Sequence, residues 1–290
     1  MIREKKLGST AVTLPEIGIG TWLYHGTPEL LRQGVDLGAA FIDTAEYYKN
    51  EELVGRAIRG IRERVFLATK VNHWRREEVK ASAEESLRKL GVERIDLYQL
   101  HWPNSAVPIQ ETLSAMEDLV DEGKVRFIGV SNFTLPELRR AERAMRKHRI
   151  VANQLRYSIV HRTIEPRLLP YCQAHDITVI AYSPLGHRFS ALQAADSEGA
   201  LAAVAGETGH TMAQVALNWC LVKPAVVVIP KTESLEHMAE NCRSSDWRLS
   251  LEQMQRLDRT VQYRSRSRME QALRRFVRGA VQWRQMILKG

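Results

Sequence analysis

Short apolar segments that alternate with helix-length amphipathic stretches constrain the fold of this chain more than any other feature. Near-continuous apolar runs of this kind are typical of parallel strands buried on both faces. Eight such segments follow one another, at residues 16–22, 40–44, 65–70, 95–101, 126–131, 150–155, 178–184 and 225–230. Eight strands alternating with helices predict an α/β fold, a single (β/α)8 TIM barrel.

The stretches between these segments have the pattern of surface helices. Residues 76–90 place apolar side chains on one stripe and charges on the other. The stripe consists of Val79, Ala83, Leu87 and Leu90. Thr134 and Thr211 each precede a later helical stretch, where a threonine side chain caps free backbone N–H groups. These patterns predict helices that cover the outside of the barrel.

The main alternative fold is an open, doubly wound sheet. That fold requires a three-glycine fingerprint after its first strand, and "GIGTWL" has only two glycines. Residues 2–14 alternate around Gly8 and Ser9, which predicts an N-terminal β-hairpin that closes the barrel floor.

The net charge of +8 is concentrated at the C-terminus. Residues 264–290 carry eight basic residues and one acid, a net +7, which leaves +1 for the rest. The body therefore has no electrostatic footprint for nucleic acid. We expect residues 1–263 to form the barrel domain and residues 264–290 a basic, amphipathic C-terminal helix. Packing of that helix on the barrel is favoured over contact with an anionic membrane surface or an acidic partner.

Composition also indicates the compartment. The N-terminus has no secretory signal, and no apolar run reaches the length of a membrane helix. Cys172, Cys220 and Cys242 are odd in number and widely spaced, which favours a reducing compartment, the cytoplasm. They lack neighbours at zinc-ligand spacing, so no metal site is predicted. We expect a monomer or weak oligomer.

Polar residues follow the predicted strands where a barrel carries its active site, at the C-terminal strand ends. They are Asp43, Lys70, His101, Ser131, Asn132, Asn153, Gln154, Tyr182, Ser183, Lys231 and Thr232. Two adjacent tyrosines, Tyr47 and Tyr48, come shortly after Asp43. An ammonium lowers the pKa of a nearby phenol, a carboxylate orients that ammonium, and an imidazole donates to a developing oxyanion. No nucleophile motif is present, so a redox cofactor that delivers hydride is the missing part.

These segments resemble the aldo-keto reductase family from about residue 5 to 262. The motifs that carry the resemblance are "DTAEYYKNE" (43–51), "ATK" (68–70), "YQLHWP" (98–103), "GVSNF" (129–133), "NQ" (153–154), "AYSPL" (181–185) and "IPKTESLEHMAEN" (229–241). The resemblance implies reduction of aldehydes and ketones to alcohols by a nicotinamide cofactor. The small-molecule carbonyl would be the only partner.

The resemblance also implies roles for individual residues. The catalytic set would be Asp43, Tyr48, Lys70 and His101, with Tyr48 as the proton donor. The cofactor would contact Thr21, Trp22, Asp43, Ser131, Asn132, Gln154, Tyr182, Ser183, Leu185, Ile229, Lys231, Thr232, His237, Glu240 and Asn241. The substrate pocket would have Trp22, Tyr24, Trp74 and Trp102 as apolar walls. Tyr47 would be a neighbour that packs against or shapes the pocket.

The cofactor end departs from the family pattern. Members that prefer NADP usually carry an arginine where this chain has His237, and Glu233 follows two residues after Lys231. A carboxylate repels a phosphate, whereas Lys231 attracts one. We therefore expect NADP(H) as cofactor with weakened discrimination, and use of NAD(H) as well.

Two other functions remain open from the sequence. A regulatory subunit that keeps the reductase fold and its cofactor pocket is the main alternative, because a fold does not fix a function. A metal-dependent barrel hydrolase is disfavoured, since the histidines are scattered and form no metal-binding motif.

Overall fold

The computed structural model describes residues 2–186 and 189–263. Within these residues, one sheet contains eight parallel strands in the order in which they occur along the chain. They are β3 (Ile19–Gly20), β4 (Phe41–Asp43), β5 (Phe66–Val71), β6 (Ile95–Leu100), β7 (Val125–Ser131), β8 (Ile150–Arg156), β9 (Thr178–Tyr182) and β10 (Val226–Ile229). Each lies within or overlaps one of the eight predicted apolar segments, so the strand prediction is confirmed.

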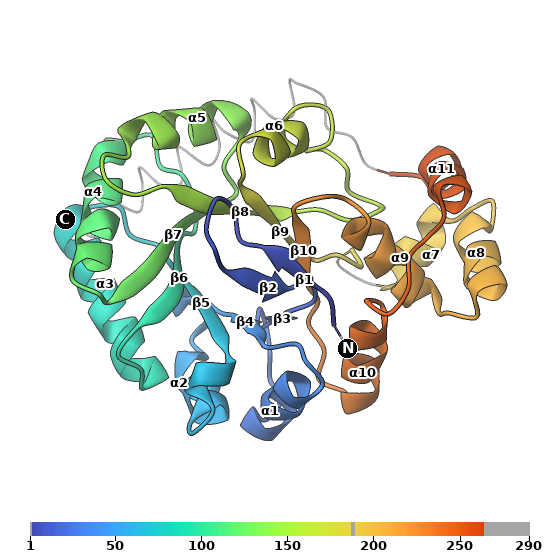
Figure 1. Ribbon diagram of the computed structural model, residues 1–290, viewed down its shortest axis with the longest axis horizontal. Coiled ribbons are helices and arrows are strands. Elements are labelled where there is room, and N and C mark those ends of the chain that lie inside the picture. Colours follow the sequence, from blue (N-terminus) through green and yellow to red (C-terminus); the bar gives the residue numbers. More distant parts are fainter. Residues whose placement is uncertain (1, 187–188, 264–290) are drawn as a thin grey trace.

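The first and last strands of the sheet meet and complete the ring. The Gly18 N–H donates to the Val228 carbonyl at 2.8 Å, and the Val228 N–H donates to the Glu16 carbonyl at 2.9 Å. Ile17 and Val228 form a parallel bridge. The sheet is therefore a (β/α)8 barrel, as predicted, and the open doubly wound sheet is excluded (Figure 1).

Helices surround the barrel in the intervals between strands (Figure 1). They are α1 (Pro28–Asp36), α2 (Glu51–Ile58), α3 (Arg76–Leu90), α4 (Ile109–Asp121), α5 (Leu135–Ala144), α6 (Leu168–Ala174), α7 (Phe189–Ala195), α8 (Ala200–Thr208), α9 (Met212–Leu221), α10 (Leu235–Arg243) and α11 (Leu251–Thr260), with 3-10 turns η1 (Glu46–Tyr48) and η2 (Arg62–Arg64). The predicted stripe of α3 is buried. Thr211 caps α9, as expected, by accepting from the Gln214 N–H at 3.1 Å.

The core has two parts because strand side chains alternate between the two faces of the sheet. Side chains that point outward, such as Ile42 and Tyr98, pack beneath the helices in the larger cluster. Side chains that point inward, such as Phe41, Leu97 and Ile180, fill the barrel itself. The barrel interior is therefore packed below the site and provides a rigid base for it.

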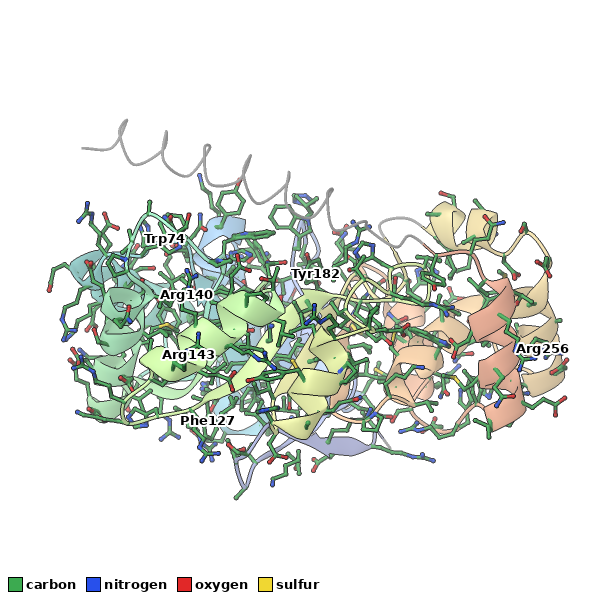
Figure 2. All side chains as sticks on the ribbon, turned by 90° about the horizontal axis from the view of Figure 1, so that it is seen from above. Trp74, Phe127, Arg140, Arg143, Tyr182 and Arg256 are labelled. Atoms are coloured by element: carbon green, nitrogen blue, oxygen red, sulfur yellow. The ribbon has the colours of Figure 1, made fainter. Side chains whose placement is uncertain are left out.

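The N-terminal hairpin closes the barrel floor, as predicted. It pairs β1 (Glu4–Lys6) with β2 (Thr13–Pro15), and both Leu7 and Leu14 are fully buried in the inner cluster. Gly8 turns the hairpin at φ +51°, where a Cβ would lie 2.5 Å from the Val151 carbonyl oxygen, so glycine is required there. Figure 2 places this hairpin at one end of the molecule and Trp74 and Tyr182 toward the other.

The expected C-terminal helix, 264–290, lies outside the described residues. Across the described part of the chain, none of the helices combines the length and the apolar character that crossing a membrane requires.

Candidate active site

A buried ion pair lies at the centre of the site. Asp43 ends β4 and Lys70 lies on the adjacent strand β5, so the sheet itself brings the two side chains together. The Lys70 ammonium donates to Asp43 Oδ2 at 2.6 Å and to the Thr44 carbonyl at 2.7 Å. Neither Lys70 nor Asp43 is more than 2% exposed. A charge pair this deeply buried persists only because each partner is neutralised and hydrogen-bonded.

The phenol of Tyr48 is the third member of this group. Tyr48 ends the 3-10 turn η1, and its hydroxyl lies 3.3 Å from the Lys70 ammonium. The preceding tyrosine, Tyr47, is 60% exposed and stacks on Trp22. Of the two adjacent tyrosines, Tyr48 is therefore the one whose hydroxyl contacts Lys70.

The pKa values of this group follow from burial and from the buried ion pair. Burial raises the pKa of Tyr48 above its usual value, and Lys70 lowers it only in part. The lowering by Lys70 was expected from the sequence, but burial outweighs it. Burial by itself disfavours the Lys70 ammonium, but Asp43 more than compensates and the pKa of Lys70 is raised. Tyr48 is therefore a protonated phenol, and Lys70 a charged ammonium, at neutral pH.

His101 follows β6 and is 8% exposed. Its ring lies edge-on to Tyr48, with centroids 5.7 Å apart. Burial and then the Lys70 charge lower the pKa of His101 to about 3. The imidazole is therefore neutral at physiological pH, and its N–H is available as an uncharged hydrogen-bond donor. Its Nδ1 is buried with no hydrogen-bond partner among the described residues.

The second carboxylate oxygen of Asp43 accepts hydrogen bonds from two glutamines of the barrel interior. Asp43 Oδ1 accepts from Gln154 Nε2 at 2.7 Å and from Gln99 Nε2 at 3.2 Å. The Asp43 backbone carbonyl accepts from the Thr21 hydroxyl at 3.0 Å. Gln99 was missed by the sequence analysis, although it lies within the quoted motif 98–103. Its position inside an apolar strand, two residues before His101, is the signal that points to it.

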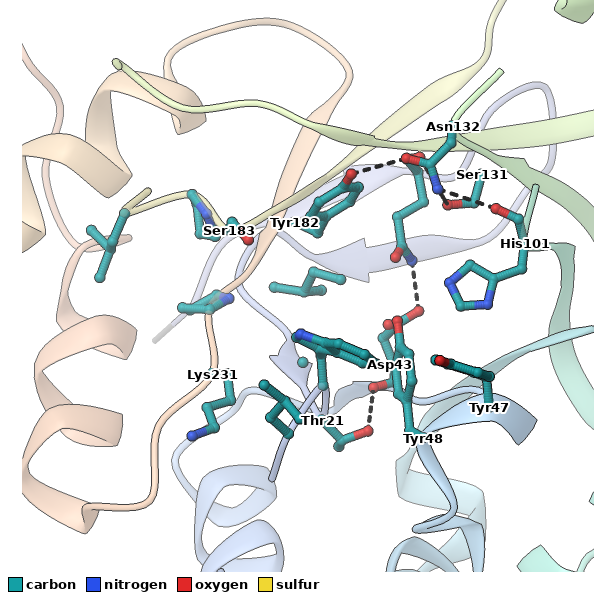
Figure 3. Close-up of a pocket in the computed structure, with 18 of the residues that line it drawn as sticks. Thr21, Asp43, Tyr47, Tyr48, His101, Ser131, Asn132, Tyr182, Ser183 and Lys231 are labelled. Atoms are coloured by element: carbon teal, nitrogen blue, oxygen red, sulfur yellow. Dashed lines mark hydrogen bonds between the residues drawn. The ribbon is translucent and has the colours of Figure 1, made fainter. Parts of the chain in front are cut away.

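A pocket of about 430 Å³ opens above this group. Its walls come from the C-terminal ends of strands around the barrel, as expected for this fold. They are Gly20, Thr21, Trp22, Leu23, Asp43, Tyr47, Tyr48, His101, Trp102, Ser131, Asn132, Gln154, Tyr182, Ser183, Pro184, Leu185, Gly186, Ile229, Pro230 and Lys231. Of the predicted catalytic set, Asp43, Tyr48 and His101 line this pocket (Figure 3). Lys70 is not part of the lining but contacts both Asp43 and Tyr48.

One wall of the pocket is a network of polar side chains. Asn132 Nδ2 donates to the His101 carbonyl at 3.1 Å and to Ser131 Oγ at 3.0 Å. The Tyr182 hydroxyl donates to Asn132 Oδ1 at 2.9 Å. Asn132 and Ser183 have left-handed backbone, with φ of 64° and 49°. Such strained conformations are retained mainly where a site requires them.

The pocket lining also includes a cation, Lys231. Ser183, Leu185 and Ile229, like Lys231 expected to contact the cofactor, belong to the same lining. The Lys231 ammonium lies 2.7 Å from Glu233 Oε1, and that carboxylate also accepts from the His25 N–H at 3.0 Å. Glu233 thus connects the loop after β10 to the loop after β3.

Four other predicted cofactor residues lie outside the pocket lining. They are Thr232, His237, Glu240 and Asn241, all on the turn after β10 or on α10. The Glu240 carboxylate accepts from the Thr211 hydroxyl and so joins α10 to α9. Asn241 is buried, whereas His237 is exposed.

The predicted substrate walls divide into two groups. Trp22 and Trp102 line the pocket, and Trp22 stacks on Tyr47 with centroids 6.1 Å apart and planes 11° apart. Tyr24 does not line it; this side chain is 3% exposed and its hydroxyl donates to the Thr27 carbonyl. Trp74 also lies outside the lining, and its indole N–H donates to the Trp102 carbonyl at 2.9 Å. Tyr47, expected to pack against or shape the pocket, belongs to its lining.

The described residues contain no cluster of three histidine, cysteine or acidic side chains that fits a metal ion. The site combines a protonated phenol, a buried ammonium and a neutral imidazole. Such a group is chemically able to protonate an oxygen atom while negative charge develops on it.

Comparison with known proteins assigns the chain and its fold to a family. The model of the aldo/keto reductase family matches residues 16–262. The chain belongs to the aldo/keto reductase family and is an oxidoreductase of that class.

Individual relatives agree with this assignment. The chain is 37% identical over 267 residues to the methylglyoxal reductase YeaE of Escherichia coli, covering 86% of this chain and 91% of the relative. Among solved structures, it is similar to the thermostable aldo-keto reductase Tm1743, with a TM-score of 0.84, 39% identity and coverage of 89% and 99%. It is also similar to an aldo/keto reductase of Klebsiella pneumoniae solved with NADP and acetate, with a TM-score of 0.82, 37% identity and coverage of 92% and 98%.

Proposed function

We propose that this protein reduces aldehydes and ketones to alcohols with NADPH or NADH. The observation that carries the proposal is the continuous contact from Asp43 through Lys70 to the Tyr48 hydroxyl, at 2.6 and 3.3 Å, on the pocket wall. Tyr48 donates its proton to the carbonyl oxygen of the substrate. The Lys70 ammonium then stabilises the phenolate that remains, and Asp43 keeps that ammonium charged and in place.

His101 polarises the carbonyl before and during proton transfer. Its low pKa keeps the ring neutral, so it donates an N–H hydrogen bond and does not compete with Tyr48 as an acid. A donor held in a buried wall is aligned before the substrate arrives, which is the condition for strong stabilisation of developing charge.

The residues of the pocket fit a nicotinamide cofactor. The lining runs from Tyr48 past the ring of Tyr182 to the Lys231 ammonium, and the amides and hydroxyl of Ser131, Asn132 and Gln154 lie between. We propose that these three groups hold the carboxamide, that Tyr182 stacks on the ring, and that Lys231 binds phosphate. When bound, the cofactor supplies the hydride that reduces the carbonyl carbon. Two Klebsiella pneumoniae relatives were solved with NADP or NADPH, which supports this assignment.

The substrate end of the pocket is aromatic. Trp22, Tyr47 and Trp102 border it on the side of His101 and Tyr48, and Trp22 is 44% exposed. We propose that these rings hold the apolar part of the carbonyl substrate, since aromatic faces provide large apolar contacts at little cost in entropy.

The proposed function is tested by following NADPH and NADH oxidation with a panel of aldehydes and ketones. The panel includes methylglyoxal, short alkanals and aromatic aldehydes. We expect turnover with aldehydes at rates typical of enzymes, of the order of 1 s⁻¹ or more. Tight binding of NADPH without oxidation by any carbonyl compound would instead support a regulatory protein on the same fold.

Glu233 bears on the choice between the two cofactors. Its carboxylate pairs with the Lys231 ammonium that we assign to phosphate, so a 2′-phosphate must compete with a charge already in place. We propose that this competition weakens the preference for NADPH. A preference for NADPH above about 10³ in kcat/KM, which is about 4 kcal/mol, would contradict the proposal.

The variant Glu233→Gln tests this role directly. It removes the competing charge, and we expect the ratio of kcat/KM for NADPH over NADH to rise about five- to tenfold. The matched control is Glu236→Gln, an exposed acid in the first turn of α10. Equal ratios in the wild type and Glu233→Gln would show that the Lys231–Glu233 pair does not influence cofactor choice.

We further propose that the protein works in the cytoplasm, as a monomer or weak oligomer, with residues 1–263 as its barrel domain. Cys172, Cys220 and Cys242 are all free and buried. Burial raises the pKa of each of these thiols. Buried, protonated thiols fit a reducing compartment.

A further inference from the structure

Glu46 opens the 3-10 turn that carries Tyr48, and its carboxylate contacts two other elements. Oε1 accepts from the backbone N–H of Asn72 at 2.5 Å, directly after strand β5. Oε2 accepts from the hydroxyl of Ser82 on helix α3. The side chain of Glu46 is 18% exposed, so these contacts are partly shielded from water.

These contacts connect the two chain segments that carry the proton donor and its partner. Tyr48 lies two residues after Glu46, and Asn72 lies two residues after Lys70. The carboxylate of Glu46 thus joins the turn of Tyr48 to the strand end of Lys70. The Tyr48–Lys70 contact, at 3.3 Å, is at the long end of hydrogen-bond distances, so a small displacement of the turn breaks it.

The other end of this segment, at Asn50, is fixed by different hydrogen bonds. Asn50 Oδ1 accepts from the Thr44 hydroxyl at 2.7 Å, and Asn50 Nδ2 donates to the Thr21 carbonyl at 2.8 Å. Asn50 therefore attaches the segment to β4 and to the loop after β3. Neither of these hydrogen bonds of Asn50 reaches β5, the strand of Lys70. Of Glu46 and Asn50, it is Glu46 that attaches the segment to the end of that strand.

The charge of Glu46 acts on other groups. Its carboxylate raises the pKa of Glu51 and of Tyr98, although burial is the main cause for both. It also lies 3.8 Å from His73 Nε2. The shift in the pKa of Tyr48 comes from burial, Lys70 and Asp43. Any influence of Glu46 on Tyr48 is therefore expected to act through position rather than through charge.

We propose that Glu46 is a positioning residue for carbonyl reduction, which sets the distance between the Tyr48 hydroxyl and the Lys70 ammonium. The inference rests on the proposed function. Removal of the carboxylate frees the turn, so Tyr48 spends less time in the geometry that transfers a proton. A misplacement of about 1 Å reduces rates up to about 10²-fold.

The test compares four variants by steady-state kinetics, NADPH affinity and thermal unfolding. Glu46→Ala loses both contacts, and we expect kcat to fall about tenfold while KM for the aldehyde and the Kd of NADPH change less than about twofold. Glu46→Gln keeps an acceptor for Asn72 and a polar group for Ser82, and is expected to retain at least half of kcat. Glu52→Ala, an exposed acid in the first turn of α2, is the matched control and should match the wild type.

The fourth variant, Glu46→Asp, keeps the charge but is shorter by one methylene. We expect a severalfold loss of kcat, and this variant carries the test if Glu46→Ala does not fold. The inference would be overturned if Glu46→Asp and Glu46→Ala both kept the wild-type kcat. It would also be overturned if Glu46→Gln lost as much kcat as Glu46→Ala. If the wild-type protein itself shows no turnover, the proposed function fails. This outcome differs from failure of the positioning inference, in which the wild type turns over and the variants match it.

Discussion

Tyr48→Phe is expected to lower kcat for carbonyl reduction by about 10²- to 10⁴-fold, the range that positioned proton donors contribute. The substitution removes one oxygen atom whose contact with Lys70 is 3.3 Å long, so the fold and NADPH binding should persist. Stopped-flow and steady-state assays with a reactive aldehyde measure the loss, and quenching of tryptophan fluorescence measures NADPH binding.

The adjacent tyrosine provides the control for this experiment. Tyr47→Phe removes the same atom from a side chain that is 60% exposed and stacks on Trp22. We expect it to retain most of the activity because the ring, and not the hydroxyl, forms the pocket wall. Unchanged turnover in Tyr48→Phe would overturn the proposed mechanism, and an equal loss in both variants would remove the distinction between the two phenols.

Lys70→Met is expected to impair both the reaction and the fold. Without the ammonium, the phenolate of Tyr48 has no stabilising charge beside it, and we expect kcat to fall about 10²-fold or more. The Asp43 carboxylate is left buried without its cation, which typically costs about 3–5 kcal/mol. Gln99 and Gln154 still donate to Asp43 Oδ1, so we expect the lower end of that range.

The double variant Asp43→Asn/Lys70→Met separates these two effects. It removes both charges, so we expect urea unfolding to show most of the lost stability restored, while activity stays as low as in Lys70→Met. If the single variant Lys70→Met were as stable as the wild type, the buried Asp43–Lys70 pair would not contribute to the stability of the fold. Recovery of activity in the double variant would contradict the role of the ammonium in proton transfer.

The predicted architecture was accurate because it depended on local patterns. The eight apolar segments and the stripe of α3 reflect the periodicities of strand and helix, which are properties of neighbouring residues. The boundaries of α3, residues 76–90, coincide with the predicted stretch. The hairpin was also visible, since Gly8 and Ser9 interrupt an alternating pattern.

The structure brings predicted site residues together where they lie at strand ends. The carboxyl ends of parallel strands meet at one rim, so the order of the strands predicts that Asp43, Lys70, His101 and Ser131 lie close together. Tyr24 and Trp74 lie on loops, whose course a sequence pattern does not fix. The structure places Tyr24 in the core, whereas Tyr47, expected to pack against or shape the pocket, lines it.

The sequence by itself thus determined the barrel, the family and the list of polar strand ends, because all three depend on the order and spacing of residue types. The tertiary structure decided which side chains are buried and which pair across distant segments. Burial outweighs Lys70 in setting the pKa of Tyr48, and the contacts of Glu46 with Asn72 and of Glu233 with His25 join loops far apart in the chain. Such contacts depend on the packing of whole elements, which local spacing does not encode.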